Sequence, residues 1–275
     1  TGRPRSGART DSGKAARARA GPPPVFVEVH GGPTLQNPIV QFMFRYQILA
    51  AAGYTVILPN PRGSIGYGEK FTSKSNGDWG DGPFGDILAC ADDAIERGLA
   101  DATRQFIGGY SYGGYMSSFA VGRTRRFKAA VIGAPVVNLT SEFGSSDAGR
   151  FLAEAVGDPW EARELVESQA PITYAPSVTT PVLLYVYEGD LRCPPSQCDE
   201  FFTALKWHGS EVEYVRYPGG SHLSALTMIG PPSQSEDRER RVLDWLARHG
   251  GVRAQAESTR QEKRPGRRPA PRRDT

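Results

Sequence analysis

A serine at position 111 stands among four glycines in the stretch GGYSYGGYMSSFA, residues 108–120. Its centre, Gly109 to Gly113, fits the pattern Gly-x-Ser-x-Gly, in which a strained strand-to-helix turn lifts a nucleophilic hydroxyl clear of a sheet. A chain this rich in glycine and serine produces the pattern readily by chance, so its surroundings must decide. An apolar run, residues 105–107, precedes it and a run of small residues follows, as a strand and a helix would. We therefore interpret Ser111 as a nucleophile and not as one polar residue of a soft loop.

A nucleophilic serine needs a base, and the base needs a carboxylate that orients it. His222 follows the last apolar run, in the loop sequence Pro-Gly-Gly-Ser-His, and is favoured as the base. Asp190 follows the apolar run 182–187 and completes the chain order Ser, Asp, His that this kind of turn requires. Glu188 is the competing carboxylate, and Asp190 could instead only shape the turn beside its glycine neighbour. The other histidines end a strand or lie near helix ends: His30, His208 and His249.

Acyl transfer also needs two backbone N–H groups that stabilise the developing oxyanion. One is expected from Tyr112, the residue after the nucleophile, and the other from the loop His-Gly-Gly-Pro at residues 30–33. Glycines let backbone approach a substrate closely, although the loop could also be a simple turn. The loop, the serine, the acid and the histidine, in this chain order, predict a serine hydrolase that needs no metal and no organic cofactor.

These residues follow short apolar segments that alternate with helical patterns. The apolar segments are nearly continuous in Val, Ile, Leu and aromatic residues, as is typical of strands buried on both faces. The alternation predicts an α/β fold: a mostly parallel sheet with helices on both faces and functional groups in the loops after the strands. Residues 23–249 are expected to form one domain. The expected strands are 25–29, 55–58, 105–107, 129–132, 182–187 and 212–217, and the expected helices are 39–51, 84–97, 114–121, 161–169, 196–208 and 234–248.

The two ends of the chain differ from this middle part in charge. The net charge is +3, yet residues 1–22 carry six Lys and Arg against one acid, and residues 251–275 carry eight against three. Both ends are poor in large apolar side chains, so we expect residues 1–22 and the Arg/Pro-rich tail 250–275 to be disordered. Basic arms can bind nucleic acid, but the absence of interleaved aromatic residues argues against that partner.

Composition also bears on location. No apolar run reaches the length of a membrane span and none reads as a secretory signal, so no membrane partner is expected. The three cysteines, Cys90, Cys193 and Cys198, have no metal-ligand spacing. An odd and sparse cysteine count indicates a reducing compartment, and we expect a cytoplasmic protein.

Eight stretches together resemble the catalytic domain of the prolyl oligopeptidase family of serine peptidases, and within it the acylaminoacyl-peptidase-like branch. The resemblance covers about residues 24–249 and implies the α/β-hydrolase fold. Joined in this order, the motifs are far more specific than a lone Gly-x-Ser-x-Gly. They are HGGP (30–33), NPRGSIGYGEKF (60–71), GDWGDGPFGDI (77–87), GGYSYGGY (108–115), GAPVVNL (133–139), GDP (157–159), EGDLRCPPSQ (188–197) and YPGGSH (217–222).

The resemblance assigns roles to individual residues. It implies Ser111, Asp190 and His222 as a catalytic triad, with the N–H groups of Gly32 and Tyr112 as the oxyanion hole. Both N–H groups would then point at the carbonyl oxygen of the bond being cleaved.

Substrate contacts are implied as well. Arg192 matches an arginine that holds a carbonyl of the bound peptide, although a surface salt bridge is an equally good interpretation. Tyr112 and Val136 match positions that line the pocket beside the scissile bond. Other motif residues are expected to fix loops, cap helices or support the structure: Arg62, Asp81, Asp86 and the region of Trp79.

Two features of the family are not encoded here. Its members carry an N-terminal β-propeller, and their HGGP motif normally follows the third strand of the hydrolase sheet. Residues 1–22 contain no apolar run that could supply two earlier strands. We therefore expect a C-terminal fragment that lacks the propeller and the first two strands. An uncovered sheet edge favours self-association, so a homo-oligomer is also expected as one outcome.

The sequence thus predicts a serine-type peptidase that hydrolyses short peptides through an acyl-enzyme, as an oligopeptidase, an acylaminoacyl-peptidase or a dipeptidyl-peptidase does. Two alternatives stay open. One is a carboxylesterase on the same fold, because a Ser-Asp-His triad handles esters at least as easily as amides. The other is a truncated, inactive remnant that only binds a partner.

Overall fold

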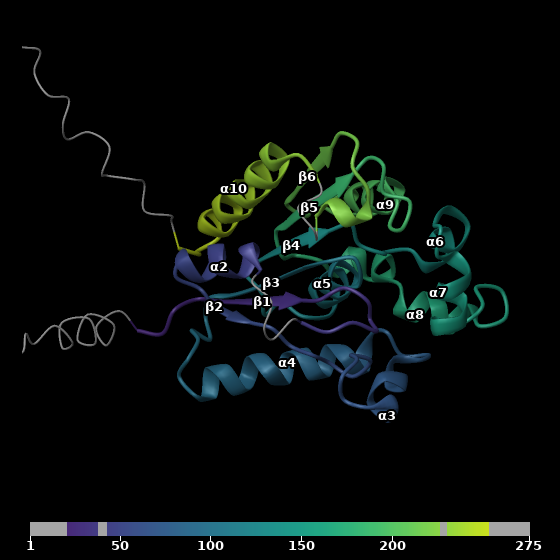
Figure 1. The fold of residues 1–275 in the computed structure, drawn as a ribbon, viewed down its shortest axis with the longest axis horizontal. Helices are drawn as coiled ribbons and strands as arrows, with labels where there is room; N and C mark the ends of the chain where they lie inside the picture. Colours follow the sequence, from purple (N-terminus) through teal and green to yellow (C-terminus); the bar gives the residue numbers. More distant parts are fainter. Residues whose placement is uncertain (1–20, 38–42, 226–229, 253–275) are drawn as a thin grey trace, which may run out of the picture.

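The computed structural model describes residues 21–37, 43–225 and 230–252 (Figure 1). Most of the two basic ends, whose disorder we expected, lies outside the described residues. So do residues 39–42, the start of the first expected helix.

Six strands form one sheet in the order β2-β1-β3-β4-β5-β6, and every neighbouring pair is parallel. The four central strands are buried along their whole length, as their continuous apolar sequences predicted, whereas β2 and β6 at the two edges are partly exposed. The strands are β1 (Val25–Val29), β2 (Thr55–Ile57), β3 (Gln105–Tyr110), β4 (Ala129–Gly133), β5 (Val182–Tyr187) and β6 (Val212–Tyr217).

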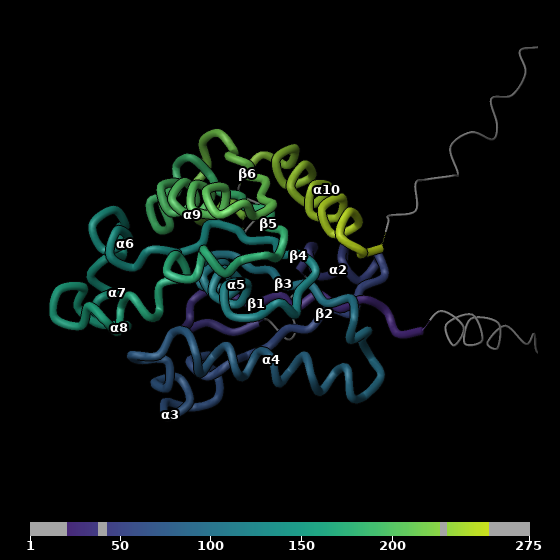
Figure 2. The backbone as a smooth tube through the Cα atoms, turned by 180° about the vertical axis from the view of Figure 1, so that it is seen from behind, coloured from purple at the N-terminus to yellow at the C-terminus, as the bar shows by residue number. Residues whose placement is uncertain are grey.

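Helices cover both faces of this sheet. They are α2 (Phe44–Ala51), α3 (Glu69–Thr72), α4 (Asp81–Glu96), α5 (Tyr112–Arg123), α6 (Leu139–Ser145), α7 (Gly149–Val156), α8 (Arg163–Gln169), α9 (Pro195–Trp207) and α10 (Pro232–Arg248), with short 3-10 turns η1 (Ser73–Ser75), η2 (Pro171–Ser177) and η3 (His222–Ser224). Seen from opposite sides, Figures 1 and 2 show α2 and α10 on one face and α5 and α9 on the other. The predicted α/β architecture is confirmed. No helix in the described ranges is long and apolar enough to cross a bilayer.

The segment between β4 and β5 differs most from expectation. Helices α6 and α7 were not predicted: α6 is rich in serine, threonine and glycine, and α7 begins with glycine, all of which are weak helix formers. The N-cap residue Asn138 fixes the start of α6, because its side chain accepts hydrogen bonds from the N–H groups of Thr140 and Ser141. Figure 1 shows α6, α7 and α8 grouped at one end of the sheet.

The start of α4 is held by a carboxylate that precedes the helix. Asp78 accepts a hydrogen bond from the Gly82 N–H at 3.0 Å, whereas the N-cap residue, Gly80, has no side chain. Asp81 lies in the first turn and pairs with Arg123 at 2.9 Å.

The expectation for the neighbouring loop is confirmed. The Arg62 guanidinium donates two hydrogen bonds to the Asp86 carboxylate, at 2.8 and 2.7 Å, and the Arg62 backbone N–H adds a third at 2.9 Å. Asp86 therefore fixes the loop that carries Arg62 to helix α4.

The strand order creates a switch point beside β1. From β1 the chain moves to β2 on one side, and it returns to place β3 on the other side. Ligands of open α/β sheets bind where the strand order reverses, beyond the carboxyl ends of the strands. Because Val29 is paired with Gly109, the HGGP loop and Ser111 leave the sheet next to each other.

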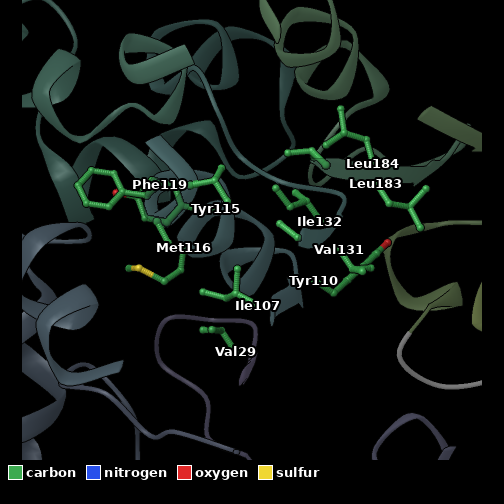
Figure 3. Packing of buried hydrophobic residues seen from close by; sticks show 14 of the residues in the cluster. Val29, Ile107, Tyr110, Tyr115, Met116, Phe119, Val131, Ile132, Leu183 and Leu184 are labelled. Carbon is green, nitrogen blue, oxygen red and sulfur yellow. The ribbon is translucent and has the colours of Figure 1, made fainter. Parts of the chain in front are cut away.

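Helix α5 packs so closely on β1 and β3 that one position in the helix and one in β3 require glycine. A Cβ atom on Gly113 would lie 2.0 Å from the Val29 carbonyl oxygen, and one on Gly109 would lie 2.5 Å from the same oxygen. This approach seats the helix directly on the sheet. Figure 3 shows the large buried side chains that α5 then packs beside the strands: Tyr115, Met116 and Phe119.

A substitution of Gly113 by alanine tests this contact. We expect Gly113→Ala to lower the free energy of unfolding by roughly 3 kcal/mol or more, because backbone must move to admit the methyl group. Gly85→Ala is the matched control, since Gly85 is also helical but its Cβ would meet nothing within 4 Å. The control should be neutral or stabilising by up to about 1 kcal/mol. Equal effects in urea denaturation would contradict the close contact.

Candidate active site

Ser111 occupies the sharp turn between β3 and α5. Its backbone has φ 61° and ψ −122°, a conformation that non-glycine residues rarely adopt. The turn is held by hydrogen bonds from the Ser111 N–H to the Gly133 carbonyl, at 3.0 Å, and from the Tyr115 N–H to the Ser111 carbonyl, at 2.9 Å. Backbone strain of this kind is found at functional sites that the surrounding structure over-determines. The hydroxyl also lies at the positive end of the α5 dipole.

Asp190 and His222 come from the loops after β5 and β6 and form a pair. The His222 Nδ1 atom lies 2.8 Å from Asp190 Oδ2. The Asp190 side chain is fully buried, and its other oxygen accepts the N–H groups of Arg192 and Cys193, both at 2.9 Å. With its Nδ1 proton held by the carboxylate, the imidazole has Nε2 left to accept a proton.

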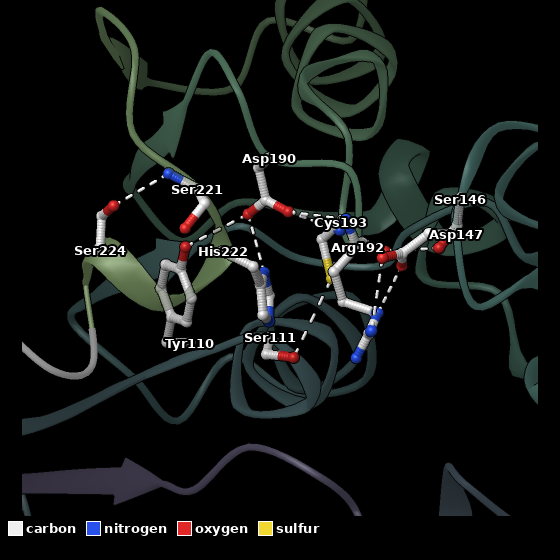
Figure 4. A network of polar contacts seen from close by, with 10 residues as sticks. All are labelled: Tyr110, Ser111, Ser146, Asp147, Asp190, Arg192, Cys193, Ser221, His222 and Ser224. Carbon is white, nitrogen blue, oxygen red and sulfur yellow. Dashed lines mark hydrogen bonds and ion pairs between the residues drawn. The ribbon is translucent and has the colours of Figure 1, made fainter. Parts of the chain in front are cut away.

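The structure brings the three predicted residues together. Figure 4 shows the His222 ring between Asp190 and Ser111. In this rotamer the Ser111 hydroxyl is directed toward Cys193, with 4.0 Å between Oγ and Sγ, and no hydrogen bond joins it to His222 among the residues drawn. Catalytic hydrogen bonds are often absent or long before substrate binds, and rotation about χ1 of Ser111 redirects its oxygen.

Tyr110 is a part of the site that the sequence did not single out. Its hydroxyl donates a hydrogen bond to Asp190 Oδ2 at 3.3 Å, and its ring centre lies 5.0 Å from that of His222. Burial, followed by the charge of Asp190, raises the pKa of Tyr110, so the hydroxyl stays a donor. Its place in Gly-x-Ser-x-Gly gives no signal, because that position accepts many residue types.

Glu188, the competing carboxylate, does not reach the histidine pair. Its side chain is half exposed, and its recorded partner is Arg216, with 3.7 Å between charged atoms. The geometry therefore favours Asp190 as the group that orients His222.

Gly32 and Tyr112 both line the pocket next to Ser111. Gly32 has φ 131°, and a Cβ there would lie 2.6 Å from the Thr34 nitrogen, so the loop requires glycine. Tyr112 is the first residue of α5, where an N–H has no partner within the helix. Neither N–H donates a hydrogen bond to another described residue. Both groups are thus open to an anion, and their role as an oxyanion hole stays a prediction.

His30 anchors this loop instead of taking part in chemistry. Its Nδ1 lies 2.6 Å from the Gly31 carbonyl oxygen and its Nε2 lies 2.9 Å from the Ser64 hydroxyl. Burial lowers the pKa of His30, which keeps the ring neutral. The histidine therefore holds Gly31 and Gly32 in place.

A pocket of about 80 Å³ opens beside the serine. Five of the predicted site residues contribute to its wall: Gly32, Ser111, Tyr112, Val136 and Arg192. Six further wall residues were not predicted as site residues: Trp79, Glu142, Ala148, Phe151, Leu152 and Cys193. Most of these come from α6, α7 or their surroundings, the segment whose helices the sequence did not reveal. Trp79 is buried, as a structural residue would be, and also forms wall.

Arg192 is half exposed and paired with Asp147, with 2.5 Å between Nε and Oδ1. The expected salt bridge is therefore present. Because Arg192 also lines the pocket and its guanidinium carries five donors, N–H groups remain for a substrate carbonyl. The clamp on substrate stays a prediction.

Glu142 is the unexpected ionisable group of the pocket. It is 3% exposed, and its Oε2 atom is buried without a hydrogen-bond partner in the described part of the chain. Burial raises the pKa of Glu142 to about 8, and the charges of Asp190, Asp147 and Glu200 act in the same direction, against a hydrogen bond from Ser146 that lowers it.

The thiol beside Ser111 is inert. Burial raises the pKa of Cys193 well above its ordinary value, so the group is a neutral thiol and not a competing nucleophile. Within residues 21–37, 43–225 and 230–252, no group of three His, Cys, Asp or Glu could hold a metal ion.

The raised pKa of Glu142 gives a stability test. The folded chain holds a proton on Glu142 up to about pH 8, whereas the unfolded chain releases it near 4.5. Wild-type stability should therefore fall relative to Glu142→Gln as the pH rises between these values, by at most roughly 5 kcal/mol. Urea denaturation at both ends of this window measures the difference. The exposed variant Glu154→Gln should track the wild type, and a Glu142→Gln curve that also does so would contradict the burial effect.

Comparisons with known proteins agree with this geometry. Residues 40–253 match the model of the prolyl oligopeptidase family. A Bacillus subtilis protein described as uncharacterized peptidase YuxL is 38% identical over 229 residues, which cover 82% of this chain and 34% of that protein. The acylamino-acid-releasing enzyme of Arabidopsis thaliana is 32% identical over 209 residues, covering 72% and 27%.

Solved structures give the same result. The acylaminoacyl peptidase of Pyrococcus horikoshii superposes with a TM-score of 0.81 at 31% sequence identity, covering 87% of this chain and 39% of that one. This chain therefore spans about a third of the length of its relatives. The predicted α/β-hydrolase fold is confirmed, and the chain belongs to the prolyl oligopeptidase family of serine peptidases.

Proposed function

We propose that this chain carries the catalytic machinery of a serine-type peptidase that cleaves short peptides by acyl transfer. One observation carries the proposal: a buried Asp190–His222 pair, 2.8 Å apart, lies beside a serine held on a strained turn. The acylamino-acid-releasing enzymes and acylaminoacyl peptidases among the relatives support a peptide substrate.

The proposed reaction begins when Ser111 Oγ attacks the scissile carbonyl carbon and His222 Nε2 takes its proton. Asp190 holds the Nδ1 proton and stabilises the imidazolium that forms. The N–H groups of Gly32 and Tyr112 stabilise the oxyanion of the tetrahedral intermediate. His222 then gives the proton to the leaving amine, the C–N bond breaks, and an acyl-enzyme remains.

Water completes the cycle in the proposed mechanism. His222 takes a proton from the water as its oxygen attacks the acyl carbon. The second tetrahedral intermediate collapses, the Ser111 ester bond breaks, and the proton returns to Ser111 Oγ. No metal or organic cofactor enters these steps.

The groups around the serine suggest how a peptide is oriented. Arg192 offers guanidinium donors to a carbonyl on the acyl side of the scissile bond, and Asp147 holds it in position. Tyr112 and Val136 form apolar wall of the pocket for the adjacent side chain. The cytoplasmic location and the homo-oligomer stay predictions.

Labelling with a fluorophosphonate tests the nucleophile. The wild type should be labelled, and Ser111→Ala should not, because a fluorophosphonate reacts with an activated serine hydroxyl. Ser117→Ala, in the same helix, is the control that should retain labelling. A folded wild type that stays unlabelled would support the inactive remnant. Turnover of a short nitrophenyl ester without any cleavage of a peptidyl anilide would favour the carboxylesterase.

The role of the acid is tested by Asp190→Asn. We expect kcat on a peptidyl anilide to fall by about 10⁴-fold, because the amide no longer fixes the tautomer of His222. Glu188→Gln is the matched control, and its kcat should change by less than about threefold, since this half-exposed side chain pairs with Arg216. A large loss in the control with a small loss in Asp190→Asn would reverse the assignment.

A further inference from the structure

The pocket beside Ser111 contains one carboxyl group that has no charged partner among the described residues. Glu142 lines the pocket, is 3% exposed, and leaves Oε2 without a hydrogen bond in the described structure. We propose that Glu142 makes this pocket selective for a positively charged side chain, that of lysine or arginine, on the acyl side of the cleaved bond. The inference rests on the proposed peptidase function and names its substrate class.

The charges around the pocket are unequal. Two ionisable residues line it, and the charge of one of them, Arg192, is neutralised by Asp147. Glu142 has no cationic partner among the described residues. A buried carboxylate without a counter-ion is costly, so buried charges are normally paired. The missing partner of Glu142 is therefore expected to be supplied from outside the chain.

Neighbouring acids strengthen this argument. Asp190, Asp147 and Glu200 all act to raise the pKa of Glu142, so the pocket lies in a region of negative potential. An anionic substrate side chain would be repelled by these groups. A cation would be attracted by them and would offset the burial of Glu142.

The rest of the wall suits the stem of a long basic side chain. Apart from Glu142 and Arg192, large wall residues are apolar or aromatic, including Trp79, Phe151 and Leu152. Lysine and arginine carry an apolar stem that packs on such surfaces and a charged head that needs a partner. A pocket with apolar walls and one carboxylate therefore offers a surface for the stem and a partner for the charged head.

A purely structural role explains Glu142 less well. A glutamate in the first turns of a helix often stabilises the helix N-terminus, but α6 is already capped by Asn138. A carboxylate that stabilised the fold would be expected to have donors, as Asp190 has. For Glu142, a hydrogen bond with Ser146 lowers the pKa, but burial has the larger and opposite effect.

The experiment compares anilide substrates that differ only at the residue on the acyl side: lysine against its uncharged analogue norleucine, and arginine against citrulline. Assays run above the pKa of about 8 of Glu142, where its carboxylate is ionised and lysine is still charged. In Glu142→Gln, kcat/KM for the lysyl substrate should fall about 30-fold or more, because one partner of a desolvated charge pair is lost. The norleucyl value should change by less than about threefold.

Two further variants guard against a folding defect. Glu154→Gln, on the exposed face of α7, should leave both substrates unaffected. Glu142→Leu places an apolar group of similar size at the site and should reverse the preference, so that the norleucyl substrate is cleaved faster than the lysyl one. Such a reversal requires a folded, active enzyme and cannot come from instability.

A binding measurement separates this inference from the proposed function. Calorimetric titration of Ser111→Ala with Nα-acetyl-lysinamide and Nα-acetyl-norleucinamide needs no turnover. Tighter binding of the lysine compound, lost in Ser111→Ala/Glu142→Gln, supports the inference. Fluorophosphonate labelling with equal cleavage and equal binding of the two compounds would overturn the inference and leave the peptidase proposal standing. An unlabelled wild type would defeat the peptidase proposal, and the inference with it.

Discussion

The close contact between α5 and β1 is the constraint on which the rest of the site depends. Gly113 and Gly109 lie so near the Val29 carbonyl that neither position has room for a Cβ atom. With the helix seated on the sheet, the chain between β3 and α5 must turn within one residue, and Ser111 takes the strained conformation. The HGGP loop continues directly from the strand that α5 touches. A packing requirement of the core thus sets the distance between the serine and the two free N–H groups.

A second constraint acts across the loops, through one buried carboxylate. Asp190 accepts hydrogen bonds from Tyr110 at the end of β3, from His222 after β6, and from two N–H groups of its own loop. The carboxyl ends of three parallel strands are therefore tied together at one residue. Four donors also satisfy the buried charge, which would otherwise be strongly destabilising. The carboxylate that orients the imidazole is at the same time the joint that holds these loops.

Much of this arrangement was predictable because its signals are local. The buried strands are apolar runs, so their positions were predicted closely, and Ser111, Asp190 and His222 stand at strand ends with turn residues beside them. Other parts carry no local signal. Helix α6 is rich in serine, threonine and glycine, and α7 begins with glycine, so neither resembles a typical helix in composition. Tyr110 and Glu142 acquire their roles only from side chains distant in sequence, Asp190 for the first and the pocket wall for the second.

The two buried carboxyl groups of the site are chemically alike but have different surroundings. Asp190 is fully buried and surrounded by donors, so its charge is stabilised inside the protein. Glu142 is almost as buried, but Oε2 has no donor in the described structure and other acids lie nearby, so the protein alone disfavours its charge. A carboxylate in the first environment serves the fold and the imidazole. A carboxyl group in the environment of Glu142 lowers the stability of the folded chain whenever it ionises. Destabilising groups of this kind are typical of functional sites. A cation that enters the pocket removes this penalty, and the free energy gained is then available for binding.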